Sequence, residues 1–222
     1  MPEPILYAND VSGYCCKVRI VLAHKRIAHA ERAPPDGYGS AAYRAIVPAG
    51  TIPGLVHGDL VLSESEAIVE YLDEAWPEPP MLPGSPAARA RLRQLSRFHD
   101  SRLEPPLRSL FAHVAPAARD EASVSAGLAL FAQRLEELAA IATPAPLLAG
   151  TDLTLADCGY PATLMLGRGM AAAFGRSFTL PRAIAAYEEA LAAQPAVAPA
   201  LARCTAATEA WFAAKLSRPL PF

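Results

Sequence analysis

The sequence predicts two parts, an α/β domain with a mixed four-stranded sheet over residues 1–80 and an all-helical domain over residues 86–222. Three observations lead to this expectation. Short apolar runs alternate with helical patterns in the first part, and a strand–turn–strand signal occurs near its end. A proline-rich stretch at 76–84 then stops any helix that approaches it. Beyond this stretch, apolar residues recur only at helical spacing.

Composition describes an ordinary globular protein. The 222 residues are 52% hydrophobic, which is enough to bury a sizeable core. A net charge of −2 gives no basic surface for DNA or RNA, so we expect no nucleic-acid partner. We expect a cytoplasmic protein without a membrane partner, because there is no signal pattern and no apolar run of about 20 residues.

Cysteine and histidine positions indicate neither a disulfide framework nor a metal centre. Cys15 and Cys16 are adjacent and cannot bridge each other without strain, and Cys158 and Cys204 lie far along the chain. None of the five histidines has metal-ligand spacing with another histidine or with a cysteine pair. We therefore expect no metal.

Ser12 stands where the first apolar strand, at 5–7, gives way to a helix predicted over 14–26. Its hydroxyl can act as an ordinary helix N-cap. Alternatively, it can meet a negatively charged ligand atom, because a helix start exposes N–H groups and a partial positive charge. This turn alone leaves both interpretations open.

The next elements complete a mixed sheet. A strand is expected at 30–33, parallel to the first because a helix connects them, and one weak helical turn at 41–46 follows. Apolar runs at 55–57 and 60–62 flank a Gly-Asp turn and predict a β-hairpin, which adds an antiparallel edge. The simplest packing is one sheet covered by helices.

The helix after the hairpin is predicted to begin at Ser63, as N-cap, with Glu66 three residues later. Glu64 and Ser65 place polar groups at this second helix start. One interpretation is a plain cap beside an exposed acid. The other is a site where a ligand carboxylate meets the Ser65 hydroxyl and N–H while a ligand ammonium meets Glu64.

Ile52-Pro53 leads into the hairpin. A proline at this place is ordinarily an edge or turn residue. If the peptide bond is cis, the Ile52 backbone groups turn outward at the end of the sheet that carries Ser12, where they can pair with a peptide-like ligand as an added strand does.

Three segments together resemble the thioredoxin-like N-terminal domain of glutathione S-transferases. They are the turn at 12–15, Ile52-Pro53 and the stretch 64–72 (ESEAIVEYL), of which the last is the most specific. The Val-Arg-Ile continuation at 18–20, together with the serine at position 12, is most similar to bacterial and zeta-like members of the serine type.

The resemblance implies a role for each of these residues. Ser12 would donate a hydrogen bond to the glutathione sulfur and favour its thiolate. Ile52, with a cis bond to Pro53, would hold the cysteinyl backbone, and Glu64 and Ser65 would hold the γ-glutamyl group. Glutathione is then a co-substrate, the other substrate is a small apolar electrophile, and the protein is a homodimer.

Two departures from the family pattern bear on function. Thr51 stands where many members carry Lys, Gln or His for the glycyl carboxylate of glutathione. Ser12 and Cys15 stand where glutaredoxin-like relatives have two cysteines, so dithiol exchange at this turn is disfavoured. We interpret Cys15 as a small buried apolar residue.

The second part is expected to be helical throughout. A helix capped by Ser85 should carry an apolar stripe to Leu103 and break or kink at Pro105-Pro106. We expect this helix and residues 103–111 to form the wall of an apolar pocket facing Ser12. Further helices are indicated near 128–138, 181–191 and 201–212, and the tail at 218–222 is expected to be irregular.

Thr154-Leu155-Ala156-Asp157 has the form of a capping box, with the Thr154 side chain accepting from the Asp157 N–H and the Asp157 side chain reaching back. It is similar to the (S/T)-x-A-D box that opens a buried helix in the glutathione transferase C-terminal domain. We therefore interpret Thr154 and Asp157 as folding residues and assign no catalytic role to Asp157.

The leading functional hypothesis is a glutathione transferase with a role in detoxification. In this fold the sulfur can add to a substrate, displace halide or assist a cis-trans isomerisation, and the sequence does not choose between them. One alternative is a non-catalytic binding protein of the same fold, motivated by Thr51. Another is a glutathione-dependent thiol reductase that uses Cys15.

Overall fold

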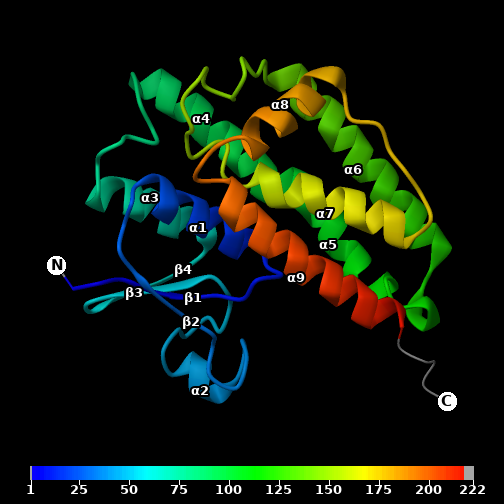
Figure 1. Cartoon of the computed structure of the whole chain (residues 1–222), viewed down its shortest axis with the longest axis horizontal. Helices are drawn as coiled ribbons and strands as arrows, with labels where there is room; N and C mark the ends of the chain where they lie inside the picture. Colours follow the sequence, from blue (N-terminus) through cyan, green and yellow to red (C-terminus); the bar gives the residue numbers. More distant parts are fainter. Residues whose placement is uncertain (1, 218–222) are drawn as a thin grey trace.

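The sheet in the N-terminal part of the chain has the strand order β2–β1–β3–β4 (Figure 1). This computed structural model describes residues 2–217, so the irregular tail expected at 218–222 lies outside it. β1 pairs parallel with β2 and antiparallel with β3, and β3 pairs antiparallel with β4, which confirms the mixed four-stranded sheet. The strands are β1 (Ile5–Tyr7), β2 (Ala30–Arg32), β3 (Gly54–His57) and β4 (Leu60–Ser63).

Helices cover both faces of this sheet. Alternate residues of a strand face opposite sides, and β1 follows this rule. Leu6 packs in the main core with α1 and α3, whereas Tyr7 packs with Tyr43 of α2 in a smaller cluster on the other face. The helices of this part are α1 (Gly13–His24), α2 (Ala41–Arg44) and α3 (Ser65–Ala75).

The prediction that Ser63 caps α3 is wrong. Ser63 pairs with Gly54 as the last residue of β4, so the sheet holds it in an extended conformation. The N-cap position belongs to Glu64, which makes no side-chain capping bond and has a φ of 71°. The helix therefore begins at Ser65 after a left-handed residue that is not glycine.

The remaining described residues form a helical region, as expected. Ser85 caps α4 by accepting a hydrogen bond from the Ala88 N–H. The elements are α4 (Pro86–Phe98), the π-helical segment η1 (His99–Leu103), α5 (Glu104–Ser109), the 3₁₀ turns η2 (Leu110–His113) and η3 (Pro116–Ala118), α6 (Glu121–Ile141), α7 (Tyr160–Ala173), α8 (Arg182–Ala192) and α9 (Ala198–Leu216).

The interruption expected at Pro105-Pro106 begins earlier, at His99. The backbone passes through π-helical η1, and the two prolines then lie in the first turn of α5. Proline is tolerated there because the first N–H groups of a helix have no intrahelical partner. The prolines thus start a helix after the irregular segment instead of breaking a continuous one.

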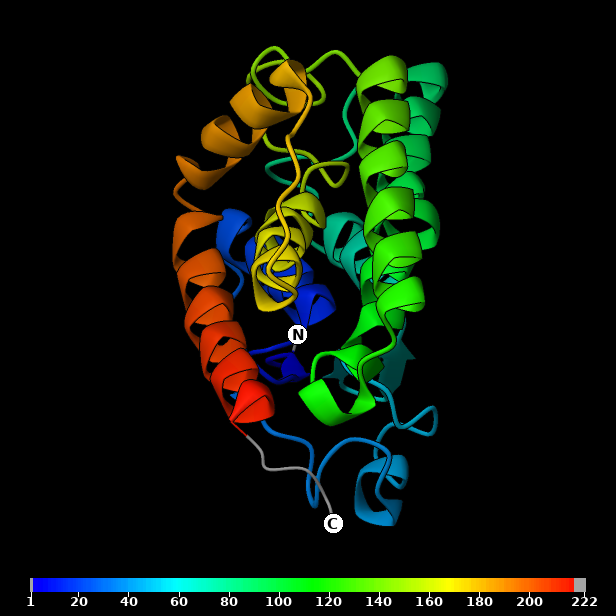
Figure 2. The same cartoon turned by 90° about the vertical axis from the view of Figure 1, so that its right-hand side faces the viewer.

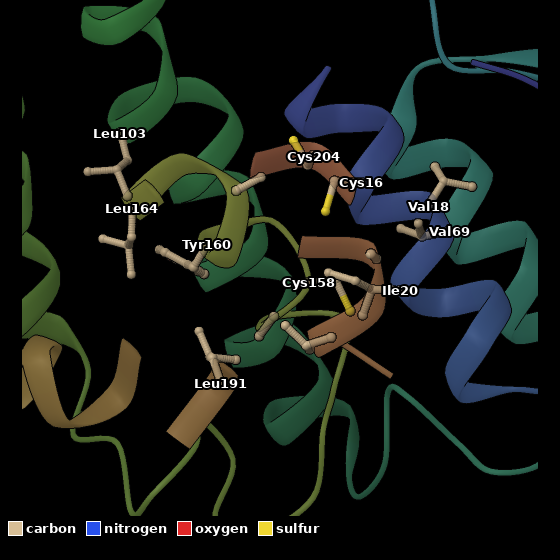
Figure 3. Packing of buried hydrophobic residues seen from close by; sticks show 14 of the residues in the cluster. Cys16, Val18, Ile20, Val69, Leu103, Cys158, Tyr160, Leu164, Leu191 and Cys204 are labelled. Atoms are coloured by element: carbon tan, nitrogen blue, oxygen red, sulfur yellow. The ribbon is translucent and has the colours of Figure 1, made fainter. Parts of the chain in front are cut away.

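Helix α7 occupies the centre of the helical region. Figure 2 shows it (yellow) between α9 and α8 on one side and α6 on the other. It also packs against α1, so a single apolar core joins the sheet-bearing part to the helical part (Figure 3). No helix within residues 2–217 is both long enough and apolar enough to cross a membrane.

The turn before α7 is built around the buried carboxylate of Asp157. Its Oδ2 accepts from the Thr154 N–H at 2.9 Å and from the Thr154 hydroxyl at 2.8 Å. Its Oδ1 accepts from the Leu148 N–H at 3.1 Å and from the Tyr187 hydroxyl at 3.0 Å. The Asp157 N–H donates to the Thr154 carbonyl and not to its side chain, which differs from the expected box. Burial raises the pKa of Asp157.

Candidate active site

Two adjoining cavities open at the N-terminal ends of α1 and α3. The larger has a volume of about 460 Å³ and the smaller about 360 Å³. Tyr14, Thr51, Ile52 and Arg108 line both cavities. A ligand that fills one of them therefore borders the other.

Ser12 lines the larger cavity and is the N-cap of α1. Its Oγ accepts from the Cys15 N–H at 3.3 Å, and its own N–H donates to Asn9 Oδ1 at 2.9 Å. Within residues 2–217 the Ser12 hydroxyl proton has no acceptor. Capping uses an oxygen lone pair, whereas stabilising an anion uses the proton, so one side chain can perform both tasks.

Ile52 and Pro53 line the smaller cavity, and their peptide bond is cis. The Ile52 N–H and C=O have no hydrogen-bond partner anywhere in the described part of the chain. Exposed backbone groups at the end of a strand are suited to a ligand that pairs as an extended peptide does.

Glu64 and Ser65 line the same smaller cavity at the start of α3. Ser65 is buried, and as the first helical residue its N–H has no intrahelical partner. Glu64 is exposed, and its left-handed backbone is sterically costly for a residue with a Cβ. Ser12, Ile52, Pro53, Glu64 and Ser65, the site residues named from the sequence, thus all border one cleft.

A Tyr14–Glu104–Arg108 cluster at the junction of the cavities was missed by sequence reasoning. The Tyr14 hydroxyl donates to Glu104 Oε2 at 3.0 Å, and Arg108 Nε donates to the same oxygen at 3.1 Å. Burial, together with the Glu104 carboxylate, raises the pKa of Tyr14. The Tyr14 proton is committed to Glu104, whereas the Ser12 proton has no acceptor among the described residues and can be donated to a ligand sulfur.

Arg108 is the one arginine or lysine that lines either cavity among the described residues. About half of its side chain is exposed, and the rest packs on Tyr14 and Phe111. The sequence offers one clue. Glu104 and Arg108 are four residues apart, a spacing that suits an ion pair within a helix. Nothing local indicates that this pair meets Tyr14.

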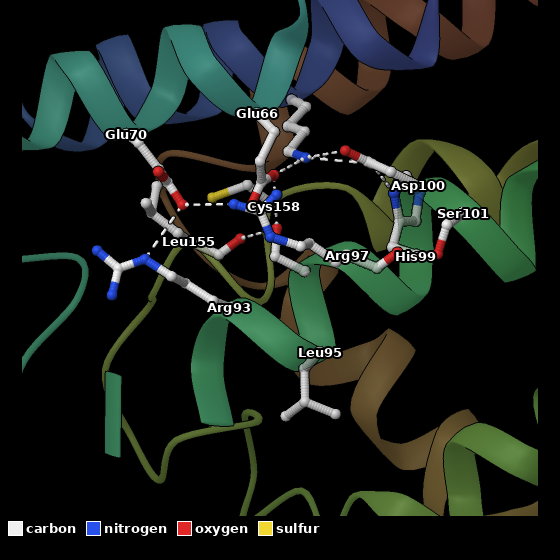
Figure 4. A network of polar contacts seen from close by, with 12 residues as sticks. Glu66, Glu70, Arg93, Leu95, Arg97, His99, Asp100, Ser101, Leu155 and Cys158 are labelled. Atoms are coloured by element: carbon white, nitrogen blue, oxygen red, sulfur yellow. Dashed lines mark hydrogen bonds and ion pairs between the residues drawn. The ribbon is translucent and has the colours of Figure 1, made fainter. Parts of the chain in front are cut away.

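A buried ion network closes the inner side of the smaller cavity (Figure 4). Lys17, with a fully buried side chain, donates to Glu66 and to Asp100 Oδ2, the latter at 2.9 Å. Both carboxylates line the cavity, and His99 Nδ1 lies 2.6 Å from Asp100 Oδ1. Burial would raise the pKa of Asp100, but His99 and then Lys17 lower it to about 2.

The wall of the larger cavity differs in part from the expected one. The expected segment 103–111 contributes, but among the described residues α4, the helix after Ser85, contributes none of the lining, and His99 belongs to η1, which follows α4. The rest of the wall comes from α7 and α9, whose contribution was not predicted. The wall residues from these helices are Ala162, Thr163, Met165, Leu166, Cys204, Thr208 and Trp211.

Thr51 and Cys15 bear on the two departures from the family pattern. The Thr51 carbonyl accepts from the Tyr43 hydroxyl at 2.9 Å, and Thr51 brings no charge to the cavities. Cys15 is fully buried and lines neither cavity, and burial raises the pKa of its thiol. Within residues 2–217 no cluster of His, Cys, Asp and Glu is arranged to hold a metal ion.

Comparison with known proteins identifies the family. Residues 6–80 match the family model described as "Glutathione S-transferase, N-terminal domain". A stringent starvation protein A homolog of Pasteurella multocida is 35% identical over 164 residues, which are 72% of each chain. Glutathione S-transferase Z1 of Arabidopsis thaliana is 43% identical over 83 residues, 35% of this chain and 37% of that protein.

A solved structure extends the similarity over nearly the whole chain. The theta class glutathione S-transferase of Xanthomonas axonopodis pv. citri, solved with glutathione bound, superposes with a TM-score of 0.76 at 26% identity. The match covers 90% of this chain and 98% of that one. The chain belongs to the glutathione S-transferase superfamily, in which it is zeta-like.

Proposed function

We propose that this protein is a glutathione transferase that binds glutathione in the smaller cavity and a small apolar electrophile in the larger one. The observation that carries the proposal is the position of Ser12. Its hydroxyl has an uncommitted proton and lines the larger cavity, beside the Ile52 that both cavities share. A glutathione-bound relative of the same fold supports the choice of ligand.

Glutathione fits the polarity of the smaller cavity. Its γ-glutamyl carboxylate would meet the Ser65 N–H and hydroxyl at the positive end of α3, and its ammonium would meet Glu64. Its cysteinyl backbone would pair with the free N–H and C=O of Ile52. This orientation directs the sulfur toward Ser12.

Ser12 would then favour the thiolate. A hydrogen bond to a charged group contributes about 1.5 to 3 kcal/mol, and the α1 dipole adds a few tenths of a kcal/mol. Because 1.36 kcal/mol corresponds to one pKa unit, the pKa of the bound thiol falls by about one to two. The thiolate attacks an electrophilic carbon in the larger cavity. In a displacement the leaving group departs with the electron pair of its bond to that carbon, and in an addition the π electron pair moves to the neighbouring atom, which then takes up a proton from solvent. No covalent enzyme intermediate is needed.

Calorimetric titration with glutathione, beside a conjugation assay with a chloro-nitroaromatic, tests the proposal. We expect wild type to bind glutathione and Ser65→Ala to bind it about tenfold more weakly, since one charge-assisted hydrogen bond is lost. Ser101→Ala is the matched control, because Ser101 is exposed and lines neither cavity. Absence of glutathione binding by wild type would refute the proposal.

A second candidate is a glutathione-binding protein without turnover. Thr51 leaves the glycyl carboxylate without the usual partner, and one relative of this chain is named a stringent starvation protein A homolog, not a transferase. Binding of glutathione without conjugation of any member of an electrophile panel would favour this candidate.

We also propose that the protein is a homodimer. The basis is membership of the superfamily. Light scattering coupled to gel filtration is expected to give a mass near twice the chain mass of 23.5 kDa. A monomer over the micromolar range would contradict this.

A further inference from the structure

Asn9 lies in the segment between β1 and α1, and it lines the larger cavity. Its Oδ1 accepts a hydrogen bond from the Ser12 N–H at 2.9 Å. A backbone N–H can only donate, so the amide atom that faces it is the oxygen. The Nδ2 group is therefore directed away from the Ser12 N–H. The hydrogen bond that holds the Ser12 backbone thus also fixes the orientation of the Asn9 amide.

The Nδ2 group of Asn9 is available to a ligand. Within residues 2–217 it has no acceptor. Asn9 is half-buried, and its Nδ2 atom is not enclosed by the protein. Other polar groups of the same cavity bond within the protein, since the Tyr14 hydroxyl donates to Glu104 and His99 Nε2 lies 2.7 Å from Thr163 Oγ1. Asn9 therefore offers an open donor beside the turn that carries Ser12.

The residue after Asn9 is anchored from two helices. Asp10 Oδ1 accepts from Arg19 Nη2 of α1 at 2.8 Å and lies 2.8 Å from Arg203 Nη2 of α9. Asn9 thus lies between this ion cluster and the Ser12 backbone, to which its own side chain is bonded. A donor that is held in place before the reaction stabilises developing charge without a cost of reorganisation.

We propose that Asn9 is a catalytic residue, whose Nδ2 group donates a hydrogen bond to the oxygen on which charge develops when the thiolate attacks a conjugated carbonyl or nitro compound. This inference rests on the proposed function, because it needs glutathione bound with its sulfur near Ser12. It adds to that function a preference among electrophiles, since an alkyl halide has no oxygen that can accept from Asn9.

Addition to an enone illustrates the role of Asn9. The sulfur forms a bond to the β-carbon, the C=C π pair becomes a π bond to the carbonyl carbon, and the C=O π pair moves to the oxygen. Asn9 donates a hydrogen bond to this enolate oxygen and keeps its proton. The α-carbon then takes a proton from solvent, which balances the proton that the thiol released, and the carbonyl re-forms. Because the oxygen is more negative in the transition state than in the substrate, the hydrogen bond lowers the barrier.

Asn9→Asp tests the donor, because aspartate keeps an acceptor for the Ser12 N–H but has no N–H group. We expect kcat/KM for trans-4-phenyl-3-buten-2-one, divided by kcat/KM for benzyl chloride, to fall about a hundredfold, as when an oxyanion donor is removed. The added charge acts on the thiolate in both reactions, so the ratio separates the donor from this effect. An unchanged ratio would overturn the proposal.

Gln94→Glu is the matched control. It makes the same change from amide to carboxylate on α4, at an exposed residue that lines neither cavity. Glutamate can still accept the hydrogen bond that Arg91 donates to Gln94 Oε1. The ratio for this variant is expected to equal that of wild type, and an equal fall in both variants would count against a specific role of Asn9.

A second measurement uses wild type, in which Asn9 is the only asparagine. Labelling with nitrogen-15 asparagine therefore gives one side-chain amide signal pair in NMR spectra. We expect the glutathione conjugate of trans-4-phenyl-3-buten-2-one to move one of these proton signals downfield, because its carbonyl accepts from Nδ2, and S-benzylglutathione to shift it much less. Equal shifts would overturn the proposal even if Asn9→Asp does not fold. Failure of glutathione and of both conjugates to bind would instead refute the proposed function on which the inference rests.

Discussion

Arg108 lies over the ring of Tyr14, with its guanidinium carbon 5.1 Å from the ring centre, at the junction of the two cavities. Tyr14 belongs to α1 and Arg108 to α5, and both bond to the buried carboxylate of Glu104. The junction of the cavities is thus made by both parts of the chain, and its positive charge comes from the helical part.

Arg108→Gln removes the only arginine or lysine side chain found in the lining of either cavity within residues 2–217. We expect about tenfold weaker glutathione binding, or a tenfold higher KM for an anionic electrophile, because a charge pair of about 1.4 kcal/mol is lost. For a neutral electrophile at saturating glutathione, kcat should change little. Arg102→Gln is the control, since Arg102 pairs with Glu137 and lines neither cavity. Unchanged glutathione affinity and unchanged KM values would show that the Arg108 charge binds neither glutathione nor an anionic electrophile.

Ser12 variants separate capping from thiolate stabilisation. Ser12→Asp keeps an N-cap oxygen but has no proton to donate at neutral pH, so we expect near-normal stability with activity reduced about ten- to a hundredfold. Ser12→Thr keeps the hydroxyl and should retain most activity. The pH dependence of kcat/KM should place the thiol pKa about one to two higher in the Asp variant. Equal activity of the Asp and Thr variants would exclude a donor role.

Glu64→Gly tests whether backbone strain is retained for ligand binding. A φ of 71° is a strained backbone conformation for glutamate but not for glycine, so the variant should be more stable by about 1 kcal/mol in urea unfolding. Glutathione binding should weaken, because the carboxylate is lost. Asp36→Gly is the control: its φ of 54° predicts a similar gain in stability without an effect on binding. A gain in stability without weaker glutathione binding would show that Glu64 does not contact the ligand.

Asp100 predicts a specific acid sensitivity. Its pKa lies at about 2 in the folded protein and near 3.8 in the unfolded chain, so it contributes stability above pH 4 that is lost as the pH falls toward 2. The contribution is about 2 kcal/mol. Urea unfolding at pH 6 and pH 3 should show a smaller loss for Asp100→Asn than for wild type, while exposed Asp152→Asn should behave as wild type. Identical losses in all three would contradict the assignment.

Asp157→Ala tests the folding role of the turn before α7. The substitution leaves the Thr154 and Leu148 N–H groups buried without their acceptor, so we expect a loss of about 3 kcal/mol of unfolding free energy. Tyr187→Phe removes one bond to the same carboxylate and should cost about 1 kcal/mol. Both variants should bind glutathione as wild type does below their unfolding temperature. Weaker glutathione binding by a fully folded Asp157→Ala variant would show that Asp157 also influences the binding site.

Local patterns were enough to predict most strands and helices, because each depends on residues close in the sequence. The turn at Ser12, the hairpin and the cap at Ser85 are such cases. Ser63 failed because a pairing partner nine residues earlier, Gly54, outweighs its intrinsic tendency to cap a helix. Serine favours the N-cap position, but pairing with Gly54 keeps Ser63 in the extended conformation of β4.

The candidate site could be predicted only where a motif marked it. Ser12, Ile52-Pro53 and Glu64-Ser65 stand in recognisable segments, and all of them border the cleft. Tyr14 and Glu104 meet across 90 residues, and Cys204 reaches the cavity through the packing of α9 on α1. These contacts depend on tertiary packing, which no local spacing encodes.

The buried ammonium of Lys17 has a consequence for how the chain can be divided. Glu66 from the sheet-bearing part and Asp100 from the helical part balance this one charge between them. A fragment that ends at the proline-rich linker would keep the lysine and one carboxylate while baring the apolar side of α1 to water. We therefore expect that neither part can be exchanged between proteins independently of the other. Evolutionary exchange of domains at 76–84 is expected to succeed only when the new helical part also supplies a carboxylate that pairs with Lys17.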